Sequence, residues 1–336
     1  MKLLRKILFP FVPLYYIVTW LRNKSYDRGW KSSKSYETAV ICVGNLSTGG
    51  TGKTPTIEYL IRLLKSKYKV ATLSRGYKRV SKGFIIADHE SDAKLIGDEP
   101  FQFYEKFEDV IVCVDANRQR GIEKLIELKQ PDVILLDDAF QHRKVKAAFT
   151  ILLTAYDDLY SEDIVLPTGN LREPKSGARR ADCIIVTKCP TGLSSFDQST
   201  IIEKLKPLRH QTIYFSSIVY SKTIFSENAV QYLDVLKDNR ITLVTGIANP
   251  KPVIDYLTSE LLDFEHLKFN DHHTFTASEI EVLQKKELIL TTEKDYMRLK
   301  DSFKLEPSKL WYLPITFNIE QDDVFNAHLL SFMNSF

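Results

Sequence analysis

The sequence GNLSTGGTGKTP at residues 44–55 constrains the fold more than any other part of the chain. It follows a short apolar run, AVICVGN at 39–45, and precedes a stretch with helically spaced apolar residues at 54–65. A glycine-rich turn between a strand and a helix presents backbone N–H groups that bind phosphate. The segment therefore predicts a nucleotide-binding loop in an α/β sheet, although Ser47 replaces the first glycine of the usual G-x-x-x-x-G-K-[ST] pattern.

The residue types of this loop indicate what each position does. Glycines let the backbone approach phosphate oxygens, lysine neutralises charge on the β and γ phosphates, and threonine ligates Mg²⁺. We therefore expect the nucleotide to contact Gly49, Gly50, Thr51, Gly52, Lys53 and Thr54. Among them Lys53 is also expected to act in catalysis, and Thr54 to bind the metal.

A second apolar run, VILLDD at 133–138, ends in two acidic residues. Strand-end aspartates often only cap turns, but beside such a loop Asp137 and Asp138 are expected to hold Mg²⁺. The guanine-reading pattern N-K-x-D is not evident, because TKCP at 187–190 lacks the aspartate. The expected cofactors are therefore ATP and Mg²⁺.

Apolar runs and helical patterns alternate along most of the chain. The runs after the loop lie at 69–74, 110–115, 133–138, 149–155 and 182–188. They predict an α/β fold of the P-loop NTPase type, a mostly parallel sheet with helices on both faces. A second α/β group spans 241–295, and the segment 191–240 is less patterned. We expect a basic, apolar N-terminal segment at 1–34, a P-loop core at 35–200 and a smaller C-terminal α/β portion at 201–336.

The N-terminal segment is basic and apolar. Residues 1–34 carry eight Lys or Arg and one acid, and an apolar run at 7–21 is interrupted by Pro10 and Pro13. This pattern predicts a membrane-associated helix that lies in the lipid interface, with a buried N-terminal helix as the alternative. No small-residue cleavage site follows it, which argues against a signal peptide. The rest of the chain is not basic, so no nucleic-acid partner is expected.

The cysteines predict neither a disulfide framework nor a zinc site. Cys42, Cys113 and Cys183 lie in apolar, strand-like runs, where cysteine usually packs in the core. Cys183 and Cys189 lack the spacing of zinc ligands. A reducing compartment fits this usage.

Five further segments follow the loop in a fixed order. They are SRGY at 74–77, GDEP at 97–100, DDAFQH at 137–142, LPTGNLREP at 166–174 and DHH at 271–273. Together with GNLSTGGTGKTP they resemble the tetraacyldisaccharide 4′-kinases, the lipid A 4′-kinase family. The resemblance covers residues 41 to about 295, and the basic, apolar N-terminus agrees with it.

This resemblance implies an activity and a place. ATP would phosphorylate the 4′-hydroxyl of tetraacyldisaccharide 1-phosphate and give the 1,4′-bisphosphorylated lipid A precursor. The partners would be this lipid substrate and the inner-membrane surface, and the protein would lie peripherally or monotopically on the cytoplasmic face of the bacterial inner membrane.

Phosphoryl transfer needs an acceptor for the hydroxyl proton, and Asp98 is the candidate. His272 matches the histidine that partners this aspartate in the family. Arg75 is expected to contact phosphate, and Glu173 to organise Mg²⁺ or the phosphates. The alternatives are that Asp98 only begins a helix, Glu173 only caps one, and Arg75 is solvated.

Two other functional hypotheses are compatible with the same loop. A switch or metal-insertion ATPase would carry a Cys/His metal motif, and none is visible. A nucleotide-gated membrane-binding module would tolerate the loss of Asp98. The ordered motifs favour the kinase.

Overall fold

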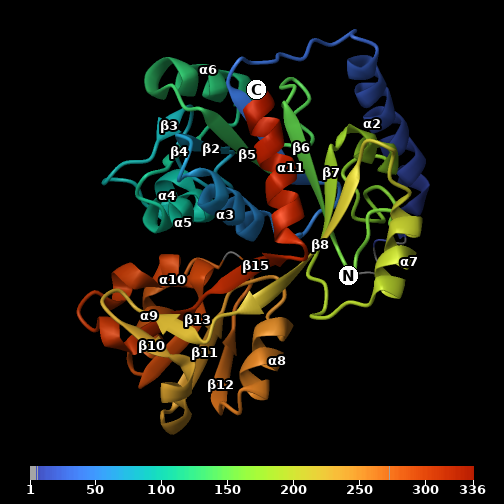
Figure 1. Cartoon of the computed structure of the whole chain (residues 1–336). Coiled ribbons are helices and arrows are strands. Elements are labelled where there is room, and N and C mark those ends of the chain that lie inside the picture. Colours follow the sequence, from blue (N-terminus) through green and yellow to red (C-terminus); the bar gives the residue numbers. More distant parts are fainter. Residues whose placement is uncertain (1–4, 6, 272) are drawn as a thin grey trace.

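The computed structural model describes the chain except residues 1–4, 6 and 272. Figure 1 shows two α/β bodies, each built on its own sheet. In the first, nine strands run in the order β15-β8-β7-β6-β1-β5-β2-β4-β3. Their bounds are β1 Ala39–Asn45, β2 Val70–Ser74, β3 Ile85–Ile86, β4 Ile111–Val114, β5 Val133–Asp137, β6 Phe149–Ala155, β7 Cys183–Thr187, β8 Thr212–Tyr220 and β15 Ile315–Ile319.

Most neighbours in this sheet are parallel, and only β3 and β15 pair antiparallel with β4 and β8. The expected mostly parallel sheet is therefore confirmed. Its helices are α3 Lys53–Leu64, α4 Ala93–Ile96, α5 Asp98–Lys106, α6 Arg118–Lys129, α7 Ser195–Leu205 and α11 Asp322–Ser335, with the 3₁₀ turn η2 at Lys175–Arg180.

Helices cover both faces of the sheet, which is why its strands are apolar throughout. In β1, Ile41 packs in a core with residues of α3, α5 and α11, whereas its neighbour Cys42 packs on the opposite face with residues of α6. Every residue of β1 is buried. A strand buried on both faces has no polar alternation, and this explains the continuous apolar runs of the sequence.

The second body is a six-stranded sheet in the order β10-β9-β14-β13-β11-β12. Its strands are β9 Thr223–Phe225, β10 Val230–Tyr232, β11 Ile241–Thr245, β12 Phe264–Lys268, β13 Leu288–Thr292 and β14 Leu310–Leu313. Its helices are α8 Lys251–Ser259, α9 Ala277–Gln284 and α10 Glu293–Leu299, and its 3₁₀ turns are η3 Leu233–Asp238, η4 Lys300–Phe303 and η5 Pro307–Lys309.

The two sheets divide the chain between β8 and β9, later than the expected boundary at residue 200. The chain also returns to the first body, because β15 pairs with β8 and α11 packs in the first core. The two crossings lie side by side, where the Ser221 N–H donates to the Pro314 carbonyl at 3.0 Å. The C-terminal portion is thus an insertion between two strands of the first sheet.

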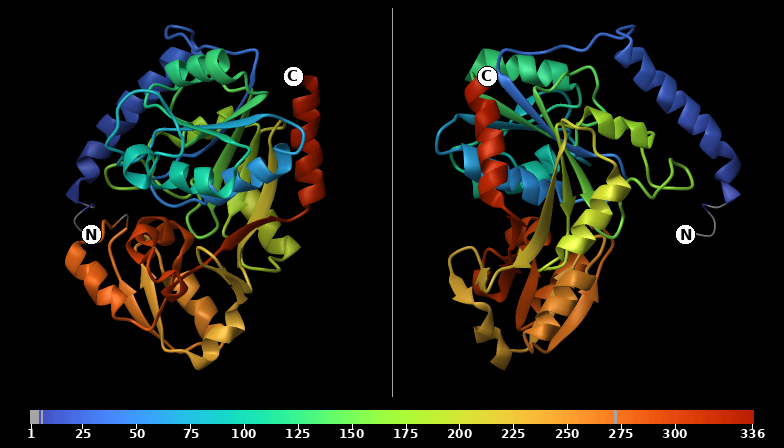
Figure 2. Two further views of the ribbon diagram at one scale, coloured as in Figure 1. Left: turned by 90° about the vertical axis from the view of Figure 1, so that its left-hand side faces the viewer. Right: turned by 45° about the vertical axis from the view of Figure 1, so that its right-hand side comes forward.

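The N-terminal segment forms the 3₁₀ turn η1 at Phe9–Phe11 and the helix α2 at Val12–Asp27. Figure 2 shows α2 along the outside of the first body. Asn23 is the one residue of α2 that is buried, so the helix lies on the surface and is not the buried alternative. Within the described residues, no helix combines the length and hydropathy that a bilayer crossing requires.

Candidate active site

The glycine loop connects β1 to α3, as the sequence predicts. Gly49 and Gly52 have φ values of 131° and 81°, in the region that favours glycine. The loop is also held from outside. The Asn45 side chain donates to the Thr51 hydroxyl at 2.8 Å, and the Thr187 hydroxyl donates to the Thr51 carbonyl at 2.9 Å.

Two residues that contact this loop were not expected from the sequence. Thr187 ends β7, and Lys188, which follows it, donates to the Gly50 carbonyl. Both lie in the TKCP segment, which the sequence only excludes as a guanine-reading motif. The available signal was its position: it directly follows a strand, and the carboxyl ends of parallel strands meet at one edge of the sheet.

The two aspartates at the end of β5 lie beside the loop, because β5 pairs with β1 and places Asp137 opposite Val43. Lys53 Nζ lies 3.5 Å from Asp138 Oδ1. Arg172 also donates to both carboxylate oxygens of Asp138, at 2.9 and 3.0 Å. Lys53, predicted to bind the nucleotide, and the two aspartates predicted to bind the metal therefore meet at one place.

The surroundings of Asp137 and Asp138 shift the pKa values of the two carboxyl groups in opposite directions. Burial raises the pKa of Asp137 to about 7, against the opposing charge of Lys53. Burial would also raise the pKa of Asp138, but Lys53 and Arg172 outweigh it and hold that pKa below its usual range. The surroundings thus favour the ionised form of Asp138 and disfavour that of Asp137.

These residues fit a magnesium ion. Asp137 Oδ1 is buried and has no hydrogen-bond partner among the described residues, as expected of an oxygen aimed at a cation. The described part of the chain contains no cluster of three or more His, Cys, Asp or Glu that could hold a metal alone. Mg²⁺ needs no such cage, because one or two carboxylates, phosphate oxygens and water complete its octahedron.

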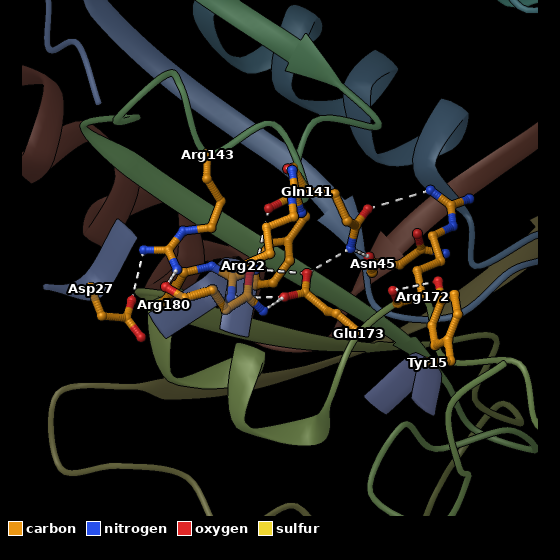
Figure 3. Close-up of polar contacts among 11 residues, drawn as sticks. Tyr15, Arg22, Asp27, Asn45, Gln141, Arg143, Arg172, Glu173 and Arg180 are labelled. Atoms are coloured by element: carbon orange, nitrogen blue, oxygen red, sulfur yellow. Dashed lines mark hydrogen bonds and ion pairs between the residues drawn. The ribbon is translucent and has the colours of Figure 1, made fainter. Parts of the chain in front are cut away.

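Glu173, expected near the metal or the phosphates, is the centre of a polar network (Figure 3). Its buried carboxylate accepts hydrogen bonds from Arg180 at 3.0 and 2.8 Å, from Gln141 at 2.9 Å and from Asn23. Gln141 also donates to the carbonyl of Asn45, at the end of β1. The structure therefore gives Glu173 a connecting position between elements, and its contact with metal or phosphate stays a prediction.

The same network joins the N-terminal helix to the site. The Tyr15 hydroxyl donates to the Arg172 carbonyl at 2.9 Å, and Arg22 donates to the Gln141 carbonyl at 2.8 Å. Arg143 pairs with Asp27 at 2.8 Å. Since the side chain of Arg172 binds Asp138, Arg172 connects α2 to the predicted metal site.

Two neighbouring basic cavities open next to these residues. One, of about 440 Å³, lies between α2 and the loop after β5, and its lining includes Arg22, Asn117, Arg118, His142 and Arg143. The other, of about 370 Å³, is lined by Arg75 with Lys78, Arg79 and Lys82. Ala116 lines both. Arg75 thus lies in a strongly cationic cavity, a suitable place for phosphate groups.

Asp98 begins α5, and its carboxylate meets the second body. Arg298 Nε donates to Asp98 Oδ2 at 3.1 Å, and the side chains form an ion pair. The neighbouring Glu99 is close enough to Asp137 for its charge to contribute to the raised pKa of that residue, so this end of α5 approaches the loop. Arg298 was not anticipated, because a lone arginine in a helical stretch gives no signal.

His272, the expected partner of Asp98, lies outside the described residues, and the pairing stays a prediction. Its neighbour His273 has local contacts. Its ring stacks on Phe269 with centroids 4.9 Å apart, and Nε2 lies 2.9 Å from a carboxylate oxygen of Glu279.

Comparisons with known proteins agree with this geometry. A family model described as tetraacyldisaccharide-1-P 4′-kinase matches residues 4–334. The chain is 54% identical to the tetraacyldisaccharide 4′-kinase of Flavobacterium johnsoniae, covering 99% of this chain and 98% of the relative. It is 42% identical to the enzyme of the same name from Bacteroides fragilis, covering 98% and 93%.

A solved structure is also similar. The crystal structure of LpxK from Aquifex aeolicus, described as an "apo" form in complex with ATP, superimposes with a TM-score of 0.80. The two sequences are 29% identical, and the match covers 98% of this chain and 99% of the other.

Proposed function

This chain belongs to the tetraacyldisaccharide 4′-kinase family, and we propose that it transfers the γ-phosphoryl group of ATP to the 4′-hydroxyl of tetraacyldisaccharide 1-phosphate. The products are ADP and the 1,4′-bisphosphorylated lipid A precursor. The observation that carries this proposal is the meeting of Lys53, Asp137 and Asp138 at the glycine loop, beside two basic cavities, one of which is lined in part by α2.

The loop from Gly49 to Thr54 binds the phosphates of ATP. Its backbone N–H groups, the N-terminus of α3 and Lys53 neutralise their charge, and this charge grows on the leaving oxygens as the bond to ADP breaks. A bound Mg²⁺ adds Lewis-acid stabilisation of the same oxygens, and Asp137, Asp138 and Thr54 are the residues that would hold it. Arg172 holds both carboxylate oxygens of Asp138 and so orients this carboxylate, which also pairs with Lys53.

Asp98 accepts the proton of the sugar hydroxyl. As the hydroxyl oxygen bonds to the γ phosphorus, its proton passes to the carboxylate of Asp98, and the bond from the γ phosphorus to the bridging oxygen breaks. His272, the proposed partner of Asp98, would orient that carboxylate.

The substrate is amphiphilic, and the surface next to the site matches it. Apolar side chains of the N-terminal segment are strongly exposed, namely Ile7, Phe9, Phe11, Leu14, Ile17, Val18 and Leu21. One of the two basic cavities is lined in part by Arg22 of α2 in the same segment, and such a cavity suits a sugar phosphate. We place the enzyme peripherally on the cytoplasmic face of the inner membrane, where α2 meets anionic lipid and ATP is present. The main body of the chain lacks the excess of basic charge that nucleic-acid binding needs.

One assay tests this function. Purified protein with ATP, Mg²⁺ and detergent-dispersed tetraacyldisaccharide 1-phosphate should yield a lipid one phosphate heavier, detected by mass spectrometry. The matched control replaces Lys53 with methionine, which keeps the side-chain length and removes the charge. Absence of the heavier lipid under conditions where the Flavobacterium johnsoniae relative forms it would refute the proposal.

A further inference from the structure

The helices α5 and α10 lie against each other although they belong to different bodies. Three ion pairs cross between them. Arg298 pairs with Asp98, Lys294 lies 2.9 Å from Glu99, and Lys106 lies 2.6 Å from Glu293. The proposed base therefore lies at a charged contact between the two bodies.

Arg298 is also held by a carboxylate of its own helix. Its Nη1 donates to Asp295 Oδ1 at 2.8 Å, and Asp295 is fully buried. The other carboxylate oxygen of Asp295 accepts from the Gly246 N–H and from the Thr292 hydroxyl, both at 2.8 Å. Asp295 is thus fixed by the backbone end of β11 and by the residue that precedes α10, and it fixes the guanidinium in turn.

The rest of the guanidinium faces the base. Nε and Nη2 of Arg298 both donate to Asp98 Oδ2. The side chains of Arg298 and Asp98 are only 8% and 17% exposed, so the pair is poorly screened by water. A rigid planar donor on one carboxylate oxygen restricts the rotation of the whole carboxylate.

We propose that Arg298 is a positioning residue, through which the second body orients the carboxylate of Asp98 and keeps it ionised for proton transfer from the sugar hydroxyl. The inference rests on the proposed function, because it assigns no reaction of its own. Asp98 belongs to the first body, so its carboxylate is held by a residue of the other body.

Other charges surround this pair and define the controls. Glu99 on α5 and Asp295 on α10 both act on Arg298, and Lys294 on α10 pairs with Glu99. Lys300 also joins the two bodies, through Glu105 on α5 and over the ring of Phe101 at 4.7 Å, but no contact between Lys300 and Asp98 is present among the described residues. Replacing Lys300 therefore weakens the same interface without touching the base.

The experiment compares Arg298→Ala, Arg298→Lys and Lys300→Ala in the full chain, with Asp98→Asn as a reference. We expect Arg298→Ala to lower kcat by about 100-fold, as misplacement of a reacting group does, with the KM for ATP nearly unchanged. Arg298→Lys keeps the charge beside buried Asp295 and so protects the fold, but it cannot bind both aspartates as a fork; we expect an intermediate kcat. Lys300→Ala should keep the wild-type kcat.

Two readouts separate positioning from a merely structural role. Loss of the guanidinium removes a charge that favours ionised Asp98, so the acid limb of the kcat profile should move to higher pH in Arg298→Ala. Added guanidinium ion at millimolar concentration should restore part of the rate of Arg298→Ala, whereas sodium chloride at equal ionic strength should not.

The outcomes are distinguishable. Wild-type kcat in both Arg298 variants overturns the inference, and so does a slow Arg298→Ala with an unchanged pH profile and no guanidinium rescue. An Asp98→Asn variant with wild-type kcat overturns the inference by removing the base. If the wild-type protein phosphorylates no lipid, the proposed function itself is refuted.

Discussion

Adjacent aspartates at the end of β5 have opposite electrostatic environments. Asp138 lies between Lys53 and Arg172, whereas Asp137 is buried with one oxygen lacking a partner among the described residues. Two like charges this close oppose each other's ionisation. A divalent cation removes that conflict, which is the physical reason why a pair of strand-end carboxylates next to a phosphate loop suits Mg²⁺.

His142 gives a pH-dependent prediction near the same site. Burial and then the charge of Arg118 lower its pKa to about 4. Between the model-peptide value of 6.5 and about 4, the unfolded chain binds a proton at this residue and the folded chain does not. The free energy of unfolding should therefore fall as the pH falls through this window.

Replacing His142 with glutamine should flatten this dependence by up to about 1 kcal/mol between pH 7 and 5, after allowance for partial solvent screening. Urea denaturation at each pH measures it. The exposed His89 provides the control, because its replacement by glutamine should leave the slope unchanged. Equal slopes for wild type and His142→Gln would show that His142 does not account for the acid sensitivity.

The N-terminal helix α2 has two distinct faces. Tyr15 and Asn23 turn inward to the network around Arg172 and Glu173, and Leu14, Ile17 and Leu21 turn outward and are exposed. An exposed apolar stripe of this kind is costly in water unless another surface covers it. Through its inward face the helix contacts Arg172, which in turn binds Asp138.

Replacing Leu14 and Leu21 with serine should weaken binding to vesicles that contain anionic lipid. Burial of a leucine side chain stabilises by about 1.5–3 kcal/mol, so each replacement should lower the partition coefficient by roughly tenfold or more. Vesicle co-sedimentation measures this. Leu305, which is 98% exposed in the second body, supplies the control as Leu305→Ser. An equal loss in the control would contradict a docking role specific to α2.

On the scale of the whole chain, the hydrophobic core of the first body includes residues of the C-terminal helix α11. Phe325 of α11 is buried among Tyr59, Tyr214 and Phe317, which come from three other parts of the first body. The second body is therefore inserted within the first, and the C-terminal helix closes the core on which the site depends.

Replacing Phe325 with alanine should lower the free energy of unfolding by about 3–5 kcal/mol, because it leaves a cavity between aromatic rings. Chemical denaturation followed by intrinsic fluorescence measures the loss. Val324 is adjacent and half exposed, and Val324→Ala should change stability by no more than about 0.5 kcal/mol. A small loss for Phe325→Ala would mean that α11 is peripheral to the first core.

Local patterns of the sequence predict much of this molecule. The order of a strand, the loop at 44–55 and a helix predicts the nucleotide site, because the expected ligands are backbone groups of consecutive residues. The apolar runs of the parallel sheet and the acids at the end of β5 are recognisable for the same reason. The less patterned segment 191–240 contains α7, β8, β9 and β10, which the sequence does not predict. For this reason the predicted boundary between the two α/β portions lies before β8, whereas the two sheets divide after it.

Only the tertiary structure decides which distant residues complete the site. Arg298 reaches Asp98 across 200 residues of sequence, and Asn23 reaches Glu173 across 150. No local sequence pattern around Arg298 or Asn23 predicts a partner so far away in the chain. The sequence determines the loop and its strands because their hydrogen bonds and apolar contacts are local or periodic. The charges around Asp138 come from packing within the first body, and those around Asp98 from packing of the second body on the first.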